Sequence, residues 1–287
     1  MKNVARTTIW LWLTMPIAIL LWIAAGSELL FDGLFPSDTP YFVAQAIGQD
    51  VVTLAVALPA LAISAILVSR GSERARLVWL GALVYVLYTY VIYAFQLHFN
   101  SLFLVYVALL GCSLYALIGG LATTDLAEIK ARFTERTPVK AASILLAVVA
   151  ILFYFAWLSE LVPALVAGGV PQSVTQNGTP TNGVHVLDMA WILPAMGLAA
   201  FWLWRKQTLG YTLAGALLTF QILLVLAIIS MTIFMARYDQ SISGGQAGIF
   251  GIVGIVNLGM LVCYLRGLKE KSPESRSAAR KVRLRRP

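Results

Sequence analysis

Eight apolar stretches, each near the length of a bilayer-spanning helix, constrain this chain more than any other feature. They cover residues 8–26, 50–69, 78–97, 101–122, 141–160, 184–204, 209–235 and 246–266. A helix needs roughly 20 predominantly apolar residues to cross the hydrocarbon core, and lipid offers no partner for an unpaired backbone N–H or C=O group. The sequence therefore predicts an all-α membrane protein with eight transmembrane helices that contact the lipid bilayer.

Composition supports this class. Hydrophobic residues make up 60% of the chain and charged residues 12%, whereas a soluble domain carries about a quarter of charged residues. The first stretch follows Lys2 and Arg6 as a signal peptide would, but it is long for one, and we expect it to be kept as a helix. We predict a single transmembrane domain over residues 1–272 and a basic, disordered cytoplasmic tail over residues 273–287.

Positive charges predict the orientation. With eight spans both termini lie on one side, and all of the 21 Lys and Arg residues except Arg237 fall on that side. Because cytoplasmic loops carry an excess of Lys and Arg, we expect both termini in the cytoplasm and the protein in the inner (plasma) membrane. We expect the basic tail to contact anionic lipid head groups, and we expect no nucleic-acid partner.

The two halves of the chain, residues 1–122 and 141–266, share a loop pattern. In each half a long outer loop follows the first span and a short inner turn follows the second. The second and sixth spans both contain Leu-Pro-Ala, and in both an arginine follows the proline by 11 residues. An even number of spans per half makes such repeats parallel, related by an axis along the membrane normal. A 4+4 internal repeat is therefore a hypothesis, and it places Asp50 opposite His185.

A polar stripe runs along the third span. It consists of Tyr85, Thr89, Tyr93, Gln96 and Asn100, which fall within about 80° of arc at helical spacing. Lipid would not solvate these groups, so we expect them to face the bundle, with Tyr106 of the fourth span among their partners. Two interpretations stay open: hydrogen bonds between helices and the wall of a polar cavity.

Ionisable residues lie where apolar spans meet the predicted outer surface. His185 and Asp188, three residues apart, share one helix face, and Asp50 and Glu160 are expected at the same depth. Asp188 lies beyond the first helical turn, and a charged carboxylate inside a membrane usually faces a bundle interior or a watery cavity. The four groups could line one vestibule, or each could be an interfacial anchor. Two clustered carboxylates would repel, so one would hold a proton near neutral pH, which suits proton-coupled transport.

No motif of known chemistry accompanies these residues. The sequence contains no HExxH, no GxSxG and no nucleotide-binding loop, and Cys112 and Cys263 do not form a CxxC pair. His98 and His185 could ligate a haem or a metal, although helical geometry places His98 away from the polar stripe. The sequence identifies no cofactor and assigns no catalytic residue. Gln221 and Asn257 are expected to bond to each other or to neighbours.

Three runs carry a resemblance to a known family. They are GQDVVTLAVALPA, GALVYVLYTYVIYAF and FNSLFLVYVALLGCSLYALI. These runs resemble an uncharacterised family of prokaryotic multi-pass integral membrane proteins. The resemblance covers most of the chain and is strongest over residues 48–120. It implies a topology and supplies no activity.

The sequence thus predicts an inner-membrane protein with an outward-facing polar cavity that binds or translocates a small or amphipathic ligand without ATP. One alternative is a membrane-embedded metal-dependent enzyme that uses His185, Asp188, Glu160 and Asp50. Another is an accessory subunit whose polar stripe bonds to a membrane protein partner or, in a homo-oligomer, to a second copy. The predicted binding residues are Asp50, Tyr85, Tyr93, Gln96, Asn100, Glu160, His185 and Asp188.

Overall fold

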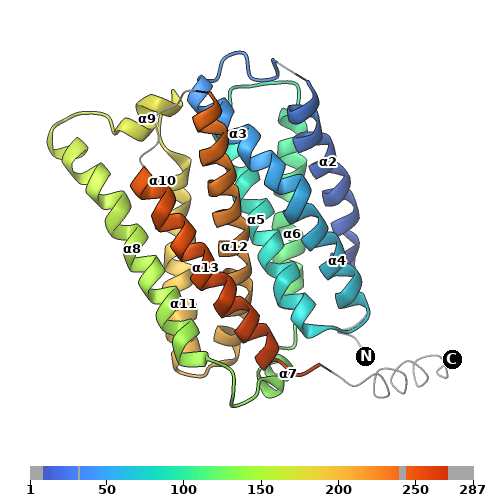
Figure 1. The fold of residues 1–287 in the computed structure, drawn as a ribbon. Coiled ribbons are helices and arrows are strands. Elements are labelled where there is room, and N and C mark those ends of the chain that lie inside the picture. Colours follow the sequence, from blue (N-terminus) through green and yellow to red (C-terminus); the bar gives the residue numbers. More distant parts are fainter. Residues whose placement is uncertain (1–8, 32, 239–243, 271–287) are drawn as a thin grey trace.

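Eight helices of the described part of the chain are long and apolar enough to cross a membrane. The computed structural model describes residues 9–31, 33–238 and 244–270. The candidate spans are Ile9–Leu30, Pro40–Ser69, Glu73–Gln96, Phe103–Ala122, Val139–Val166, Gly183–Trp204, Thr208–Arg237 and Gly248–Gly267. The predicted number of spans and the all-α membrane class are confirmed, and Figure 1 shows the helices packed as one bundle.

The spans are built from long helices and two short π-helical turns. In chain order the elements are α2 (Thr14–Leu30), α3 (Pro40–Val52), η1 (Thr53–Ala57), α4 (Leu58–Ser69), α5 (Glu73–Gln96), α6 (Phe103–Ala122), α7 (Leu126–Arg132), α8 (Val139–Val166), α9 (Gln172–Asn177), α10 (Gly183–Leu187), η2 (Asp188–Ile192), α11 (Leu193–Trp204), α12 (Thr208–Arg237) and α13 (Gly244–Gly267). We call the end of the bundle where α7 lies the basic end, and the opposite end, where α9 lies, the loop end (Figure 1).

The second span begins ten residues earlier than its apolar run predicts. Thr39 caps α3 by accepting a hydrogen bond from the Phe42 backbone N–H at 3.2 Å, and Pro40 occupies the first turn, where its missing N–H costs nothing. Gln49 and Asp50 interrupt the apolar run, so the run does not reveal the extension of the helix. Both are buried in the bundle. Asp50 is therefore inside the protein, surrounded by helices, and does not begin the second span.

Each Leu-Pro-Ala motif follows a π-helical turn. The turn Thr53–Ala57 ends immediately before Leu58-Pro59, and the turn Asp188–Ile192 ends immediately before Leu193-Pro194. Proline has no N–H for the carbonyl four residues earlier and its ring crowds that carbonyl, so the preceding turn widens. Such widened turns are frequent at functional sites.

The helix α5 forms the centre of the bundle. In Glu73–Gln96, 78% of the most apolar window is buried, because α5 packs against α4, α6 and α12. Small residues allow these close approaches: a Cβ on Gly81 would lie 2.3 Å from the Ala216 carbonyl oxygen of α12. Likewise, a Cβ on Gly48 of α3 would lie 2.4 Å from the Met231 Cα of α12.

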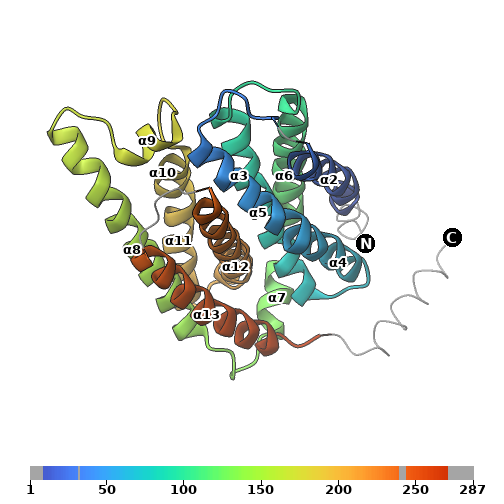
Figure 2. The same cartoon turned by 45° about the horizontal axis from the view of Figure 1, so that its top comes forward.

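The last helix, α13, lies at the edge of the bundle. Only 17% of its most apolar window is buried, and Figure 2 shows it crossing in front of α8 and α12. Asn257 Nδ2 of α13 donates to Gln221 Oε1 of α12 at 2.8 Å, which confirms the predicted pairing. This bond places two amides against each other where lipid would solvate neither.

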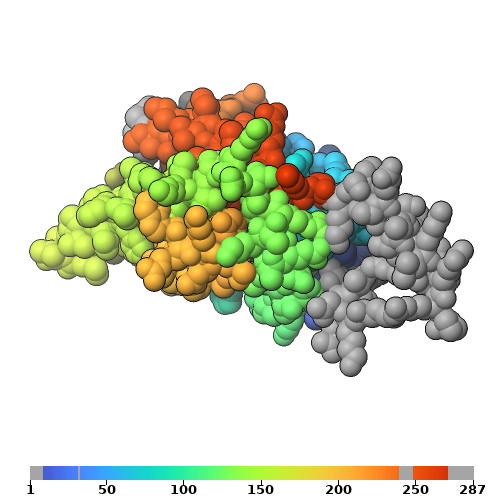
Figure 3. All heavy atoms as spheres, turned by 90° about the horizontal axis from the view of Figure 1, so that it is seen from below, coloured from blue at the N-terminus to red at the C-terminus, as the bar shows by residue number. Residues whose placement is uncertain are grey.

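The linker between the two halves closes the basic end. The Phe133 ring packs against the rings of Tyr211 and Tyr264 at 5.0 and 4.9 Å between centroids. The Lys269 backbone N–H donates to the Arg132 carbonyl oxygen at 2.9 Å. Figure 3 shows this linker in green between the orange turn of α11 and α12 and the red end of α13. The linker thus ties the last span to the middle of the chain.

Candidate functional site: two buried carboxyl clusters

Glu28 and Asp50 meet inside the bundle near the loop end. The last turn of α2 supplies Glu28, and α3 supplies Asp50. The Tyr93 hydroxyl donates to Asp50 Oδ1 at 3.2 Å, and the Tyr106 hydroxyl donates to Glu28 Oε1 at 2.5 Å. The two tyrosine donors are in contact, with ring centroids 5.5 Å apart, so the two carboxyl groups are neighbours. Asp50 is fully buried and Glu28 is 6% exposed, so neither lies at the protein surface.

Three tyrosine rings enclose this pair. The ring centroids of Tyr90 and Tyr93 lie 5.4 Å apart, those of Tyr90 and Tyr106 lie 6.0 Å apart, and those of Tyr93 and Tyr106 lie 5.5 Å apart. The Tyr90–Tyr93 and Tyr93–Tyr106 contacts are edge-on, a favourable arrangement for aromatic rings. We call Glu28, Asp50 and these three tyrosines the Glu28–Asp50 cluster. Three of its buried atoms, Glu28 Oε2, Asp50 Oδ2 and the Tyr90 hydroxyl, have no hydrogen-bond partner among the described residues.

The inner part of the polar stripe bonds to the second span. Gln49 Nε2 donates to the Tyr85 hydroxyl at 3.0 Å and to Thr89 Oγ1 at 2.7 Å. The Thr53 hydroxyl, at the start of η1, lies 3.0 Å from the Tyr85 hydroxyl. These contacts tie α5 to α3 and η1, as the interpretation of interhelical hydrogen bonds expects.

Asp188 forms the centre of a second cluster. The Tyr88 hydroxyl of α5 donates to Asp188 Oδ1 at 3.0 Å, and Trp157 Nε1 of α8 donates to Oδ2 at 2.9 Å. The Tyr154 hydroxyl donates to the carbonyl oxygen of Met189 within η2 at 2.7 Å. Asp188 is 6% exposed. The expectation that Asp188 faces the bundle interior is confirmed, and the polar groups within reach come from the third and fifth spans.

His185 and Glu160 complete this cluster. The His185 ring packs against the Trp157 ring at 4.6 Å between centroids. His185 Nε2 lies 3.7 Å from Glu160 Oε2, which is longer than a hydrogen bond, and the buried Nδ1 has no hydrogen-bond partner among the described residues. Glu160 Oε1 accepts from the Ser173 backbone N–H at 2.9 Å. We call Tyr88, Trp157, Glu160, His185 and Asp188 the Asp188 cluster.

The predicted residues divide into the two clusters, the contact of Tyr85 with the second span and a pair of loop contacts. Asp50 and Asp188 bond to different tyrosines of α5, so the idea of one vestibule lined by both is wrong. Gln96 Nε2 donates to the Thr181 carbonyl oxygen at 2.8 Å. Asn100 lies beyond the end of α5, where its Oδ1 accepts from the Leu102 backbone N–H at 2.9 Å. The polar stripe ends where the helix ends, at Gln96.

The four ligands of the metal alternative are not assembled. Asp50 belongs to the other cluster, and within residues 9–31, 33–238 and 244–270 no three His, Cys, Asp or Glu side chains are placed to hold a metal ion. His98 Nδ1 lies 2.9 Å from Asp38 Oδ1 in the loops. His98 is therefore paired outside both clusters, and a shared site with His185 is not formed.

Sequence reasoning missed Glu28, Tyr88 and Tyr90. Glu28 falls just after the first apolar stretch and therefore resembles a loop residue, although the helix continues through Leu30. Tyr88 and Tyr90 lie off the polar stripe because α5 is buried on all sides. One signal was available: α5 carries four tyrosines within nine residues, Tyr85 to Tyr93, and lipid-facing segments have no need of so many hydroxyls.

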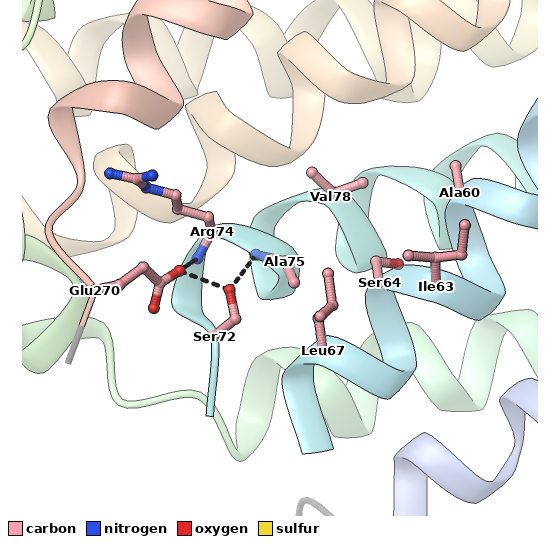
Figure 4. A pocket seen from close by; sticks show the side chains of 9 residues that line it. All are labelled: Ala60, Ile63, Ser64, Leu67, Ser72, Arg74, Ala75, Val78 and Glu270. Carbon is pink, nitrogen blue, oxygen red and sulfur yellow. Dashed lines mark hydrogen bonds between the residues drawn. The ribbon is translucent and has the colours of Figure 1, made fainter. Parts of the chain in front are cut away.

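A crevice of about 500 Å³ lies at the basic end, between α4 and α5. Figure 4 shows apolar side chains such as Leu67 and Val78 along it and Ser72, Arg74 and Glu270 at one end. Glu270 Oε1 accepts from the Ser72 hydroxyl at 2.6 Å and from the Arg74 backbone N–H at 3.0 Å. This carboxylate caps the start of α5, where the helix dipole favours negative charge. None of the residues that line the crevice belongs to either cluster.

A comparison of the chain with models of protein families, with curated proteins and with solved structures finds no match. The resemblance over residues 48–120 to a prokaryotic membrane family stays a prediction. The two clusters are therefore the features of this chain that bear on its function.

Proposed function

We propose that this protein binds, or moves across the bilayer, a small or amphipathic ligand without ATP, and that the Asp188 cluster is its ligand site. One observation carries the proposal: a carboxylate buried in an apolar bundle is held by two neutral donors, Tyr88 and Trp157. Ionisable groups inside a membrane are costly and usually functional. Neutral donors leave the negative charge available to a cationic or hydrogen-bonding ligand.

The surroundings of Asp188 suit such a ligand. Trp157 and His185 supply a stacked aromatic wall, and aromatic faces attract cations. The buried Nδ1 of His185 offers a further polar contact. Glu160 ties this wall to the first turn of α9 through Ser173, so movement of α9 would open or close the cluster. We infer that an outward-facing polar cavity forms here when a ligand enters.

We infer also that the two halves are a parallel repeat. We infer that the protein lies in the inner (plasma) membrane with both termini in the cytoplasm. The paired π-helical turns before Leu-Pro support the repeat, and they make Thr53 the counterpart of Asp188. The charge bias supports the orientation. Under this arrangement the loop end faces outward, so a ligand reaches Asp188 from outside.

Tryptophan fluorescence tests the proposal. The Trp157 indole N–H donates to Asp188, so a ligand that contacts the carboxylate would change the emission of Trp157. Purified protein in nanodiscs would be titrated with short amines, amino acids, sugars and carboxylates. We expect a saturable change for one class in the wild type, lost in Asp188→Asn and in Trp157→Phe.

Asp125→Asn is the matched control. Asp125 caps α7 at the basic end and is exposed, and asparagine caps a helix as well as aspartate does. This variant removes one carboxyl group without touching either cluster, so it should titrate like the wild type. If no class gives an Asp188-dependent change, or if Asp188→Asn titrates like the wild type, Asp188 is a structural residue and the proposal fails.

A further inference from the structure

Glu28 and Asp50 lie side by side in the bundle, because they accept hydrogen bonds from Tyr106 and Tyr93, whose ring centroids are 5.5 Å apart. The second oxygen of each, Glu28 Oε2 and Asp50 Oδ2, is buried with no hydrogen-bond partner among the described residues. A protonated carboxyl group can donate to a neighbouring carboxylate, whereas two carboxylates can only accept. We propose that the Glu28–Asp50 pair is a proton-binding site that holds one shared proton at neutral pH and exchanges it at the loop end.

The charges around the pair require this proton. The neighbouring titratable groups are tyrosines of α5 and α6, namely Tyr85, Tyr90, Tyr93 and Tyr106. From α12, the backbone around Met231 packs against α3 at Gly48. Among the described residues no lysine, arginine or histidine pairs with either carboxyl group. Two adjacent carboxylates would thus be buried without a counter-charge, which costs several kcal/mol per ion.

The hydrogen bonds favour one proton rather than two. Tyr93 and Tyr106 each donate a hydroxyl to the pair, and charge-assisted bonds of this kind stabilise a negative charge. A single shared proton removes the repulsion and leaves one charge for the two hydroxyls to bind. Two carboxyl groups that share one proton for this reason are known in enzymes. A second proton would remove the charge that the tyrosines stabilise.

The structure also supplies a route for exchange. Tyr106, which donates to Glu28, lies in the first turn of α6, and Asn100 is half-buried in the loop that leads into this turn. On release, the O–H bond of the protonated carboxyl group breaks, the proton passes to water at the loop end, and two carboxylates remain. Uptake reverses these steps. A tyrosine hydroxyl can accept and donate together, so Tyr106 can relay the proton.

This site is separate from the Asp188 cluster and does not depend on the ligand proposed there. The proton site lies in one half and the ligand site in the other, and both are hydrogen-bonded to α5. Proton-coupled binding would need such an arrangement. Either proposal can fail alone, because the proton site is tested without any ligand.

Infrared spectroscopy of the protein in lipid, titrated from acid to alkaline pH, tests the proton site. A protonated carboxyl group gives a C=O band distinct from that of a carboxylate. We expect one buried, protonated carboxyl band at neutral pH that disappears at alkaline pH. Glu28→Gln and Asp50→Asn should each lose this band, because the new amide N–H donates to the remaining carboxylate in place of the shared proton.

Controls separate a shared proton from other causes. Asp125→Asn and Asp188→Asn should keep the band of the pair, and size-exclusion chromatography should show folded protein for every variant. A wild-type spectrum that matches those of Glu28→Gln and Asp50→Asn at every pH would overturn the proposal. Loss of the band on adding sodium or potassium ions at constant pH would also overturn it, because the pair would then bind a metal cation.

Discussion

Replacing Tyr88 with phenylalanine removes one hydroxyl and nothing else from the Asp188 cluster. That hydroxyl donates to Asp188 Oδ1 at 3.0 Å, and Tyr88 is 2% exposed, so water does not replace it. A hydrogen bond to a charged group contributes about 1.5–3 kcal/mol in proteins. Hydrogen bonds between membrane helices average about 0.6 and reach about 1.7 kcal/mol. The bond to a buried carboxylate belongs near the upper membrane value, so we expect Tyr88→Phe to lower the free energy of unfolding by about 1–2 kcal/mol.

Tyr90→Phe is the matched control on the same helix. Tyr90 is fully buried and its hydroxyl has no hydrogen-bond partner among the described residues, so its loss should change the free energy of unfolding little. Unfolding in mixed detergent micelles, followed by circular dichroism, measures both variants. A double-mutant cycle of Tyr88→Phe with Asp188→Asn isolates the pair energy.

The comparison of these two tyrosines is decisive for the account of Asp188. The pairing of Asp188 with Tyr88 is refuted if both variants lose the same free energy of unfolding. It is refuted also if the coupling energy between Tyr88 and Asp188 is below about 0.3 kcal/mol, which is smaller than the usual error of additivity. Asp188 would then not be a carboxylate held by Tyr88.

Three further predictions follow from packing, protonation and charge. In Gly48→Leu the Cβ would lie 2.4 Å from the backbone of α12, inside the roughly 3.5–4.0 Å contact distance of carbon atoms, so we expect little folded protein by size-exclusion chromatography. Gly111→Ala, where a Cβ meets nothing within 4 Å, should fold, and equal yields of the two variants would contradict this packing. A folded state that binds an extra proton loses stability as the pH rises. The melting temperature of the wild type should therefore fall more between neutral and alkaline buffer than that of a variant in which Glu28 and Asp50 are both replaced by amides. Equal falls in melting temperature for the two proteins would argue against a shared proton. Reporter fusions at Gly178 and at the C-terminus should fall on opposite sides of the membrane, and a shared side would rule out the orientation.

Sequence periodicity predicted the spans because lipid imposes one rule on all of them. Every residue that faces acyl chains must be apolar, so the apolar run gives the number of helices directly. The rule fails where a helix is surrounded by protein. Gln49 and Asp50 interrupt the apolar run of the second span, but they bond to Tyr85, Thr89 and Tyr93 of α5, and the helix continues through them.

Sequence could indicate that polar groups face the bundle but could not pair them. Asp50 and Asp188 are both buried, yet which helix stands beside which depends on packing across the two halves. Glu28 lies beside Asp50 because α2 packs against α3. No spacing within either helix contains that information.

The most direct test of the ligand site is native mass spectrometry of the protein extracted from its own membrane. The central claim is that Asp188 anchors a small ligand inside the bundle. The wild type and Asp125→Asn should carry a small-molecule adduct of the same mass, and Asp188→Asn should lack it. Identical spectra for all three proteins would contradict the claim and leave Asp188 as a structural carboxylate.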